Sequence, residues 1–247
     1  MAGHSKWANI KRRKGAQDAK KGKIFSKASK AITIAARNGG GDPAANLTLK
    51  YAVDKARAAN MPNSNIEQAI KKGTGELEGL TYEELMYEGF GPGGLAVMVE
   101  AVSDKRTRTT PEIKKLFDSR GGNLGGQGSV AFGFDQRGLI DLEAPGAEEE
   151  EVLDVILEAG GEDLEAGEDG HWTVTTGPKE LHAVRTTLES HEGWTVHAGE
   201  LAWLPQNTVS PSTKELEQAY KLIDALDEHE DVQNVFTNLD PEIAPPE

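Results

Sequence analysis

The side chains best suited to chemistry in this sequence are lysines and arginines gathered near the N-terminus. Residues 1–72 hold 16 basic and 4 acidic side chains, a charge of +12, whereas the remaining residues hold 11 basic and 37 acidic ones, a charge of −26. Basic side chains bind phosphate groups and release the counterions condensed on nucleic acids. This charge difference indicates a basic nucleic-acid-binding part attached to an acidic body. A basic surface that contacts only solvent is the alternative.

Two short basic runs, residues 11–14 and 20–23, enclose a segment with little apolar content, which we expect to become ordered only on a partner. The apolar spacing over residues 23–37 then predicts an amphipathic helix with lysines aligned on its polar side. A polyanion would relieve the repulsion among these lysines. The predicted nucleic-acid contacts are Lys6, Trp7, Lys11, Arg12, Arg13, Lys14, Lys20, Lys21, Lys23, Lys27 and Lys30.

A second basic cluster lies in a predicted loop, residues 105–110, just before a helix that we expect to begin at Thr110. Threonine hydroxyls between guanidinium groups suit phosphate oxygens. One interpretation is therefore a secondary backbone contact at Lys105, Arg106 and Arg108, and the other is a solvated loop without a ligand.

Patterns that would indicate an enzyme or a metal protein are absent from the sequence. The chain has no cysteine, which excludes disulfides, thiolate zinc sites and cysteine nucleophiles and fits a reducing compartment. Walker A, H-E-x-x-H and G-x-S-x-G sequences do not occur. Four histidines fall on different predicted elements without a ligand spacing: His171, His182, His191 and His197. We therefore predict no catalytic residue, no metal and no cofactor.

The segment Gly89–Gly94 formally matches the G-x-G-x-x-G pattern of dinucleotide-binding proteins. In that pattern a helix follows the glycines and points its N-terminal amides at a pyrophosphate. Here a strand is predicted to follow, and Pro92 removes one of the amides. The segment is better interpreted as a hairpin turn.

The N-terminal domain is predicted to contain two further helices. Asp42 and Pro43 have the types expected of an N-cap and a first helical residue. Ser64 and Glu67 form a capping-box pattern for the next helix, and Gly73 is the expected C-terminal stop. These helices predict a small basic domain over residues 1–78.

The pattern then changes to that of an α/β region. Strands are predicted at Leu85–Phe90, Leu95–Val102 and Val130–Phe134, with the second of them central, and residues 123–129 are expected to be a flexible glycine-rich segment. Residues 138–204 follow in the order β-α-β-β-α-β, the arrangement of a ferredoxin-like fold.

A helix and a strand after Pro205 are too few for a domain, so we expect them to complete the sheet begun at residue 79. The predicted fold class is α+β with three domains: a basic three-helix domain (1–78), a discontinuous α/β sandwich domain (79–134 plus 206–247) and an inserted ferredoxin-like domain (135–205).

The inserted domain has 13 acidic and no basic residues between Asp141 and Gly170, so phosphate should be repelled from it. It would serve solubility or dock a basic protein partner. The N-terminal residues lack the apolar core of a signal peptide, and no segment is long and apolar enough to cross a bilayer, which predicts a cytoplasmic protein.

Several motifs resemble those of the YebC family and occur in the same order along the chain. The resemblance extends over essentially the whole chain. They are Met1–Lys11 (MAGHSKWANIK), Gly22–Phe25 (GKIF), Ala58–Pro62 (AANMP), Tyr87–Gly94 (YEGFGPGG) and Gly121–Gly125 (GGNLG). The family includes bacterial proteins described as probable transcriptional regulators and a mitochondrial translational activator of cytochrome oxidase. The resemblance implies three domains, no catalytic residue and no required cofactor.

The resemblance also implies one of two roles. The first is DNA-binding regulation of transcription, and the alternative is a ribosome-associated translation factor that binds ribosomal or transfer RNA and relieves stalling at difficult sequences such as proline runs. The absence of a convincing base-reading helix-turn-helix favours RNA or shape readout. A protein-interaction adaptor that works through the acidic part is a further alternative, and the sequence leaves the oligomeric state open.

Overall fold

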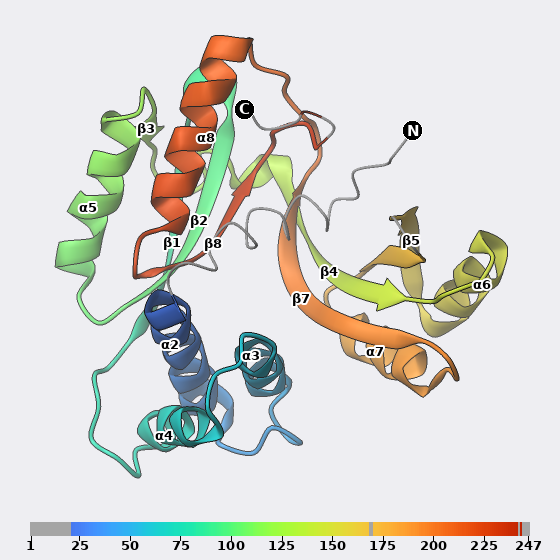
Figure 1. The fold of residues 1–247 in the computed structure, drawn as a ribbon. Coiled ribbons are helices and arrows are strands. Elements are labelled where there is room, and N and C mark those ends of the chain that lie inside the picture. The colour runs from blue at the N-terminus through green and yellow to red at the C-terminus, as the bar shows by residue number, and fades with distance from the viewer. Residues whose placement is uncertain (1–20, 168–169, 242, 244–247) are drawn as a thin grey trace. The chain divides into compact units, whose positions relative to one another are not determined.

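The computed structural model describes residues 21–167, 170–241 and 243. They divide into two compact units, which Figure 1 shows as ribbons. The large unit contains the described residues up to Gly133 together with Pro205–Leu239, and the small unit contains Phe134–Leu204. No helix within these described residues combines the length and the apolar character needed to cross a membrane.

The large unit begins with three helices, α2 (Lys21–Gly39), α3 (Leu47–Ala58) and α4 (Asn63–Thr74). Helix α2 packs against both of the others. Their shared core consists of buried apolar side chains at helical spacing: Ile32, Ala35, Ala36, Leu49, Val53, Ala56, Met61, Ile66 and Ala69. The predicted three-helix fold of this region is therefore confirmed.

The predicted N-cap of α3 is wrong, because Asn46 caps this helix instead of Asp42. Asn46 Oδ1 accepts a hydrogen bond from the amide of Leu49, and its Nδ2 donates to the carbonyls of Ala35 and Gly40. Asp42 closes the preceding turn by accepting from the amide of Ala44. Asn46 thus satisfies the first turn of α3 and the last turn of α2 at once.

The ends of α4 also differ from the prediction. Pro62 is its N-cap residue and no side chain caps the helix, so the capping box of Ser64 and Glu67 is wrong. Gly73 lies inside the helix, where a Cβ would come within 2.4 Å of the carbonyl oxygen of Thr33. It therefore permits the close approach of α2 and α4, and Gly75, at φ +83°, ends the helix.

The rest of the large unit is a four-stranded antiparallel sheet with two helices. The strands are β1 (Glu83–Phe90), β2 (Ala96–Ser103), β3 (Asn123–Leu124) and β8 (Val232–Thr237), in the order β3-β1-β2-β8. Helices α5 (Arg106–Asp118) and α8 (Thr213–Asp227) contact each other and the sheet. The predicted central position of β2 is confirmed. The glycine segment forms a β1–β2 hairpin turn, with a single 3-10 turn, η1, over Pro92–Gly94.

Three local predictions in this region are wrong. Helix α5 begins at Arg106 and not at Thr110, because Ser103 Oγ accepts from the amide of Lys105 and lies 2.6 Å from Thr109 Oγ1, which closes the first turn. Residues 105–110 are therefore mainly helical. Instead of a strand at Val130–Phe134, a 3-10 turn, η2, spans Ala131–Gly133 and precedes the first strand of the small unit.

The glycine-rich segment 123–129 is held in place by Glu88 of β1. This carboxylate is 4% exposed and accepts hydrogen bonds from the amides of Gly128, Val130 and Ala131. Burial alone would raise the pKa of Glu88, but the three amide donors outweigh it and lower the pKa. The segment that we expected to be flexible is thus anchored to the sheet.

The small unit has the predicted ferredoxin-like order. Its elements are β4 (Phe134–Glu143), α6 (Glu149–Ala159), β5 (Gly161–Ala166), β6 (His171–Thr176), α7 (Leu181–Ser190) and β7 (Thr195–Pro205). The sheet order is β5-β6-β4-β7, which places the chain's first and third strands of this unit at the centre. Alternate residues of β4 point to opposite faces, so Ile140 and Leu142 share one face while Asp141 and Glu143 share the other.

Candidate nucleic-acid interface

The predicted contact residues divide into those outside and those inside the described part of the chain. Lys6, Trp7, Lys11, Arg12, Arg13, Lys14 and Lys20 lie outside the described residues. Lys21 is the first residue of α2. Lys23, Lys27 and Lys30 follow on α2 at helical spacing, which aligns them on one side of the helix as the sequence predicted.

This aligned row contacts the C-terminal end of α8 and the turn that follows it. Lys23 Nζ donates to the carbonyl of Glu228 at 3.1 Å, and Lys27 Nζ donates to the carbonyl of Asp227 at 2.5 Å. The carbonyls at the end of a helix carry partial negative charge, which favours nearby cations. The partial negative charge of these carbonyls therefore offsets part of the positive charge of the lysine row.

Lys30 is the most deeply placed member of the row, with only 8% of its surface exposed. Its Nζ lies 2.5 Å from Asp231 Oδ1 and 3.1 Å from the carbonyl of Glu230. The buried carboxylate of Asp231 also accepts from Arg108 at 2.9 Å and from Thr109 Oγ1 at 2.7 Å. Asp231 thus links α2 to the start of α5.

The pKa of Asp231 reflects this arrangement. Burial by itself would raise the pKa, but the hydrogen bonds from Lys30, Thr109 and Arg108 outweigh it and lower the pKa to about 2. Lys27 shows the opposite balance, because its burial lowers its pKa against the attraction of Asp227. Asp231 is therefore ionised in the folded protein at neutral pH.

The predicted secondary cluster is split by the structure. Lys105 and Arg106 are exposed at the N-terminal end of α5. Arg108 is half-buried and bound to Asp231 and, at 3.0 Å, to Asp104. Lys105 and Arg106 therefore present their charges to solvent, whereas Arg108 neutralises a carboxylate of the fold.

Sequence reasoning missed a group of exposed basic side chains on the other helices of this region. They are Lys55 and Arg57 at the end of α3, and Lys71 and Lys72 at the end of α4. Basic residues in a last helical turn interact favourably with the helix dipole, which is their structural explanation. The signal was visible in the sequence as lysines and arginines just before each helix end.

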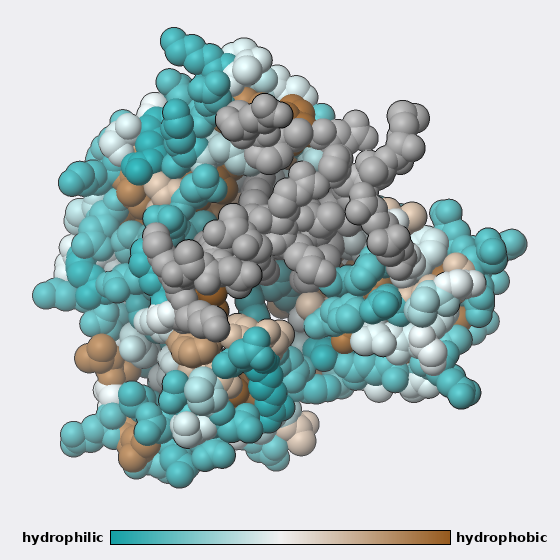
Figure 2. Space-filling view, viewed as in Figure 1, coloured by the Kyte–Doolittle hydropathy of each residue, from teal (hydrophilic) through white to brown (hydrophobic). Residues whose placement is uncertain are grey.

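Helix α4 adds polar side chains to this surface. Its first two turns expose Asn63, Ser64, Asn65 and Gln68, and a four-residue turn from Ala59 to Pro62 connects it to α3. Amide side chains can read base edges, and the basic groups can bind phosphates. In the view of Figure 2, hydrophilic residues make up most of the visible described surface.

A different set of polar side chains meets in the small unit. Glu143, His171 and His197 come from β4, β6 and β7, and each offers one ligand atom within 4.8 Å of the others. They are the side chains within the described residues that could hold a metal ion. His171 and His197 are far apart along the chain and close together in the sheet, so the lack of a ligand spacing in the sequence gave no sign that they lie near each other.

Comparison with known proteins agrees with this architecture. Residues 5–76 match the family model of the TACO1/YebC protein N-terminal domain, and residues 82–239 match that of the TACO1/YebC second and third domain. A probable transcriptional regulatory protein of Syntrophotalea carbinolica is 53% identical over 97% of this chain and 96% of its own. One from Azoarcus sp. is 50% identical over 96% and 98%, respectively.

A solved structure is also similar. The crystal structure of a conserved hypothetical protein from Aquifex aeolicus superposes with a TM-score of 0.81 at 43% identity, and the match covers 90% of this chain and 91% of that one. The resemblance seen in the sequence motifs is confirmed by these matches, which extend over nearly the whole chain. This chain is a member of the TACO1/YebC family.

Proposed function

We propose that this protein is a non-enzymatic regulator of gene expression that binds nucleic acid, with DNA as its target, through the basic N-terminal part. The observation that carries the proposal is the separation of charge, +12 over residues 1–72 and −26 over the remainder. Phosphate is attracted to the first and repelled from the second, so a nucleic acid would bind residues 1–72 rather than the remainder. The name carried by the relatives, probable transcriptional regulatory protein, supports the regulatory role.

The contacts that we propose follow from which basic groups are available. The primary contact is the run Lys11–Lys14, supported by Lys6, Trp7, Lys20 and Lys21. Arg57, Lys71 and Lys72 at the ends of α3 and α4 extend this surface, and Lys105 and Arg106 form a secondary contact. Lys27 and Lys30 contribute less, because carbonyls and carboxylates of the large unit already bind their ammonium groups.

The domain division also belongs to this proposal. Residues 1–78 act as the binding domain, and residues 79–134 plus 206–247 form the body to which it is attached. Residues 135–205 form an acidic domain that discourages non-specific binding of phosphate. We place this activity in the cytoplasm.

The test is a salt titration of binding by the full-length protein. Binding to a labelled DNA duplex and to transfer RNA is measured by fluorescence anisotropy between 50 and 300 mM salt, on the order of the range in which phosphate contacts weaken. The variant K11A/R12A/R13A/K14A should bind all duplex sequences more weakly. Its log–log salt slope should fall by about 0.9 for each lost duplex contact.

A matched control removes the same number of charges elsewhere. Four lysines that are exposed in α5, before α7 and in α8 are changed together to alanine: Lys114, Lys179, Lys214 and Lys221. Binding by this control should stay near that of the wild type. Equal losses in both variants would show that only net charge matters, and unchanged binding in the N-terminal variant would exclude the run as the main contact.

A second experiment identifies the nucleic acid in cells. Nucleic acid crosslinked to the wild type is compared with that crosslinked to the N-terminal variant, and ribosome sedimentation is examined in the same lysates. Enrichment of promoter DNA that is lost in the variant is the expected result. Crosslinks to ribosomal or transfer RNA, together with ribosome association, would replace transcriptional regulation by a role in translation.

A further inference from the structure

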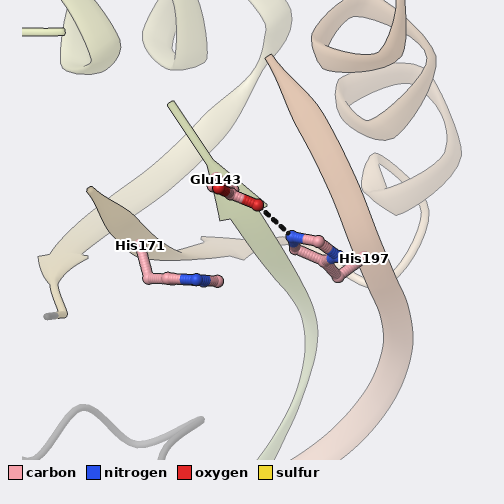
Figure 3. Close-up of side chains that lie close together, drawn as sticks. All are labelled: Glu143, His171 and His197. Carbon is pink, nitrogen blue, oxygen red and sulfur yellow. Dashed lines mark hydrogen bonds and ion pairs between the residues drawn. The ribbon is translucent and has the colours of Figure 1, made fainter. Parts of the chain in front are cut away.

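One face of the small unit's sheet collects a histidine from each strand that flanks β4. Asp141 and Glu143 are two residues apart on β4 and so point to the same face. His171 of β6 lies directly opposite Glu143 in the strand register, and His197 belongs to β7, the other neighbour of β4. Figure 3 shows Glu143 and both imidazoles close together, with a hydrogen bond between Glu143 and His197.

We propose that Glu143, His171 and His197 bind a divalent transition-metal ion such as Zn²⁺. Two imidazoles and a carboxylate are ligands that Zn²⁺ commonly uses, with water in the fourth position. Imidazole ligands favour zinc, copper or nickel over magnesium and calcium, which prefer oxygen alone. The proposal is independent of nucleic-acid binding.

The distances fit such an ion after small side-chain movements. A tetrahedral ion with bonds of about 2.0 to 2.2 Å holds its ligand atoms about 3.3 Å apart. His197 Nε2 and Glu143 Oε2 are 2.7 Å apart, and all three ligand atoms lie within 4.8 Å of one another. The three side chains are 37 to 40% exposed and therefore have room to rotate.

The spacing of the two imidazole rings is a second geometric match. Two imidazoles on one tetrahedral ion have ring centres about 5 Å apart, since each bond is about 2.0 Å long and each ring centre lies about 1.2 Å beyond its nitrogen. The rings of His171 and His197 are stacked, with their centres 5.5 Å apart and their planes at 26° to each other.

A buried carboxylate, that of Asp141, lies within hydrogen-bond distance of one of the proposed ligands, His171. The side chain of Asp141 is 5% exposed, and its Oδ1 lies 3.4 Å from His171 Nδ1. Metal-binding histidines commonly donate their second ring N–H to a carboxylate, which fixes the ring and makes the other nitrogen a better ligand. When Nδ1 of His171 donates to Asp141, Nε2 carries the lone pair that a metal needs.

The surrounding charge also favours a cation. Between Asp141 and Gly170 the chain has 13 acidic and no basic residues, so a divalent ion is attracted to this region. A bound ion would connect β4, β6 and β7 on the face that the sheet turns away from Ile140 and Leu142. Metal binding should therefore stabilise the small unit.

The test uses tag-free, full-length protein treated with EDTA and dialysed, which is then titrated with Zn²⁺ in a calorimeter. We expect one ion per chain and a higher unfolding temperature with the metal. Titration with Co²⁺ should give the intense visible absorption of a four-coordinate ion. Replacing His171 or His197 by Ala should weaken Zn²⁺ binding by at least about tenfold, and Asp141→Asn, which leaves all three ligands in place, by about tenfold.

Two further variants separate metal binding from folding. Glu143→Gln retains an oxygen that can accept from His197 but lacks the charge, so it should remain folded by circular dichroism and bind Zn²⁺ more weakly. The control H182A/H191A removes two histidines outside the cluster and should bind as the wild type does. Failure of the wild type to bind Zn²⁺ at micromolar concentrations would overturn the proposal, as would equal binding by the H171A/H197A variant.

Discussion

The buried carboxylate of Asp231 provides the most quantitative prediction. We consider Asp231→Asn, which keeps the shape of the side chain and removes its charge. In the wild type, Asp231 is 0% exposed and accepts from Lys30, Arg108 and Thr109. The asparagine leaves the ammonium of Lys30, a residue that is only 8% exposed, without its carboxylate partner.

The magnitude follows from the pKa of Asp231. The ordinary value of 3.8 falls to about 2 in the folded protein. A change of one in pKa corresponds to about 1.4 kcal/mol, so the charged form contributes about 2 kcal/mol to the free energy of unfolding at neutral pH. Because the folded pKa is the lower one, this contribution is fully present above pH 3.8 and is lost as the pH falls through about 2.

The assay is urea denaturation followed by far-ultraviolet circular dichroism at neutral pH and at several acidic pH values. Trp172, Trp194 and Trp203 lie in the small unit, so tryptophan fluorescence would report mainly on that unit. Hydrogen exchange of the α2 and β8 amides then localises the effect. Asp231→Asn should lose about 2 kcal/mol at pH 7 and show a weaker acid dependence below pH 3.8 than the wild type.

Asp227→Asn is the matched control for this prediction. The Asp227 side chain is 24% exposed, and its carboxylate lies 3.7 Å from Lys27 Nζ, so its loss should cost less than about 1 kcal/mol. Equal stability of Asp231→Asn and wild type at pH 7 would refute the reasoning. An acid dependence that Asp231→Asn leaves unchanged would refute it as well.

Two other substitutions test local features of the large unit. Glu88→Gln weakens the acceptor for three amide donors, so hydrogen exchange at Gly128 and its neighbours should accelerate by at least about tenfold, since hydrogen bonds to charged groups contribute about 1.5 to 3 kcal/mol; unchanged exchange would mean that Glu88 does not hold the segment. Gly73→Ala should destabilise by about 1 to 3 kcal/mol in urea denaturation, because its Cβ would lie 2.4 Å from the Thr33 carbonyl oxygen. Gly22→Ala, with no atom within 4 Å of its new Cβ, should be neutral or stabilising by up to about 1 kcal/mol, and equal losses in both glycine variants would contradict the packing argument.

The element order was largely accessible from the sequence because it depends on local periodicity. The strand Val232–Thr237 and the β-α-β-β-α-β order of the small unit follow from alternating or helical apolar spacing, which neighbouring residues set. Helix ends were less accessible. Asp42 has a favourable type for an N-cap, but Asn46 satisfies more hydrogen bonds, including one to the carbonyl of Ala35, which the local pattern does not reveal.

Of the two candidate sites, one could be predicted from the sequence and the other could not. The concentration of basic residues over 1–72 is a property of composition, and counting alone reveals it. The metal cluster is a property of strand order, since residues 143, 171 and 197 become neighbours only when β6 and β7 pair with β4. The spacing of these residues along the sequence does not reveal the order of the strands in the sheet.

The lysine row of α2 illustrates both kinds of information. The spacing of Lys23, Lys27 and Lys30 along the chain is enough to place them on one side of a helix, because helical geometry sets which residues align. The groups that face this row could not be predicted from the spacing, since Asp227 and Asp231 lie about 200 residues further along the chain and reach α2 through the packing of α8 and β8. Electrostatic interactions act through space, so the partner of a charge depends on the fold and not on its neighbours in the sequence.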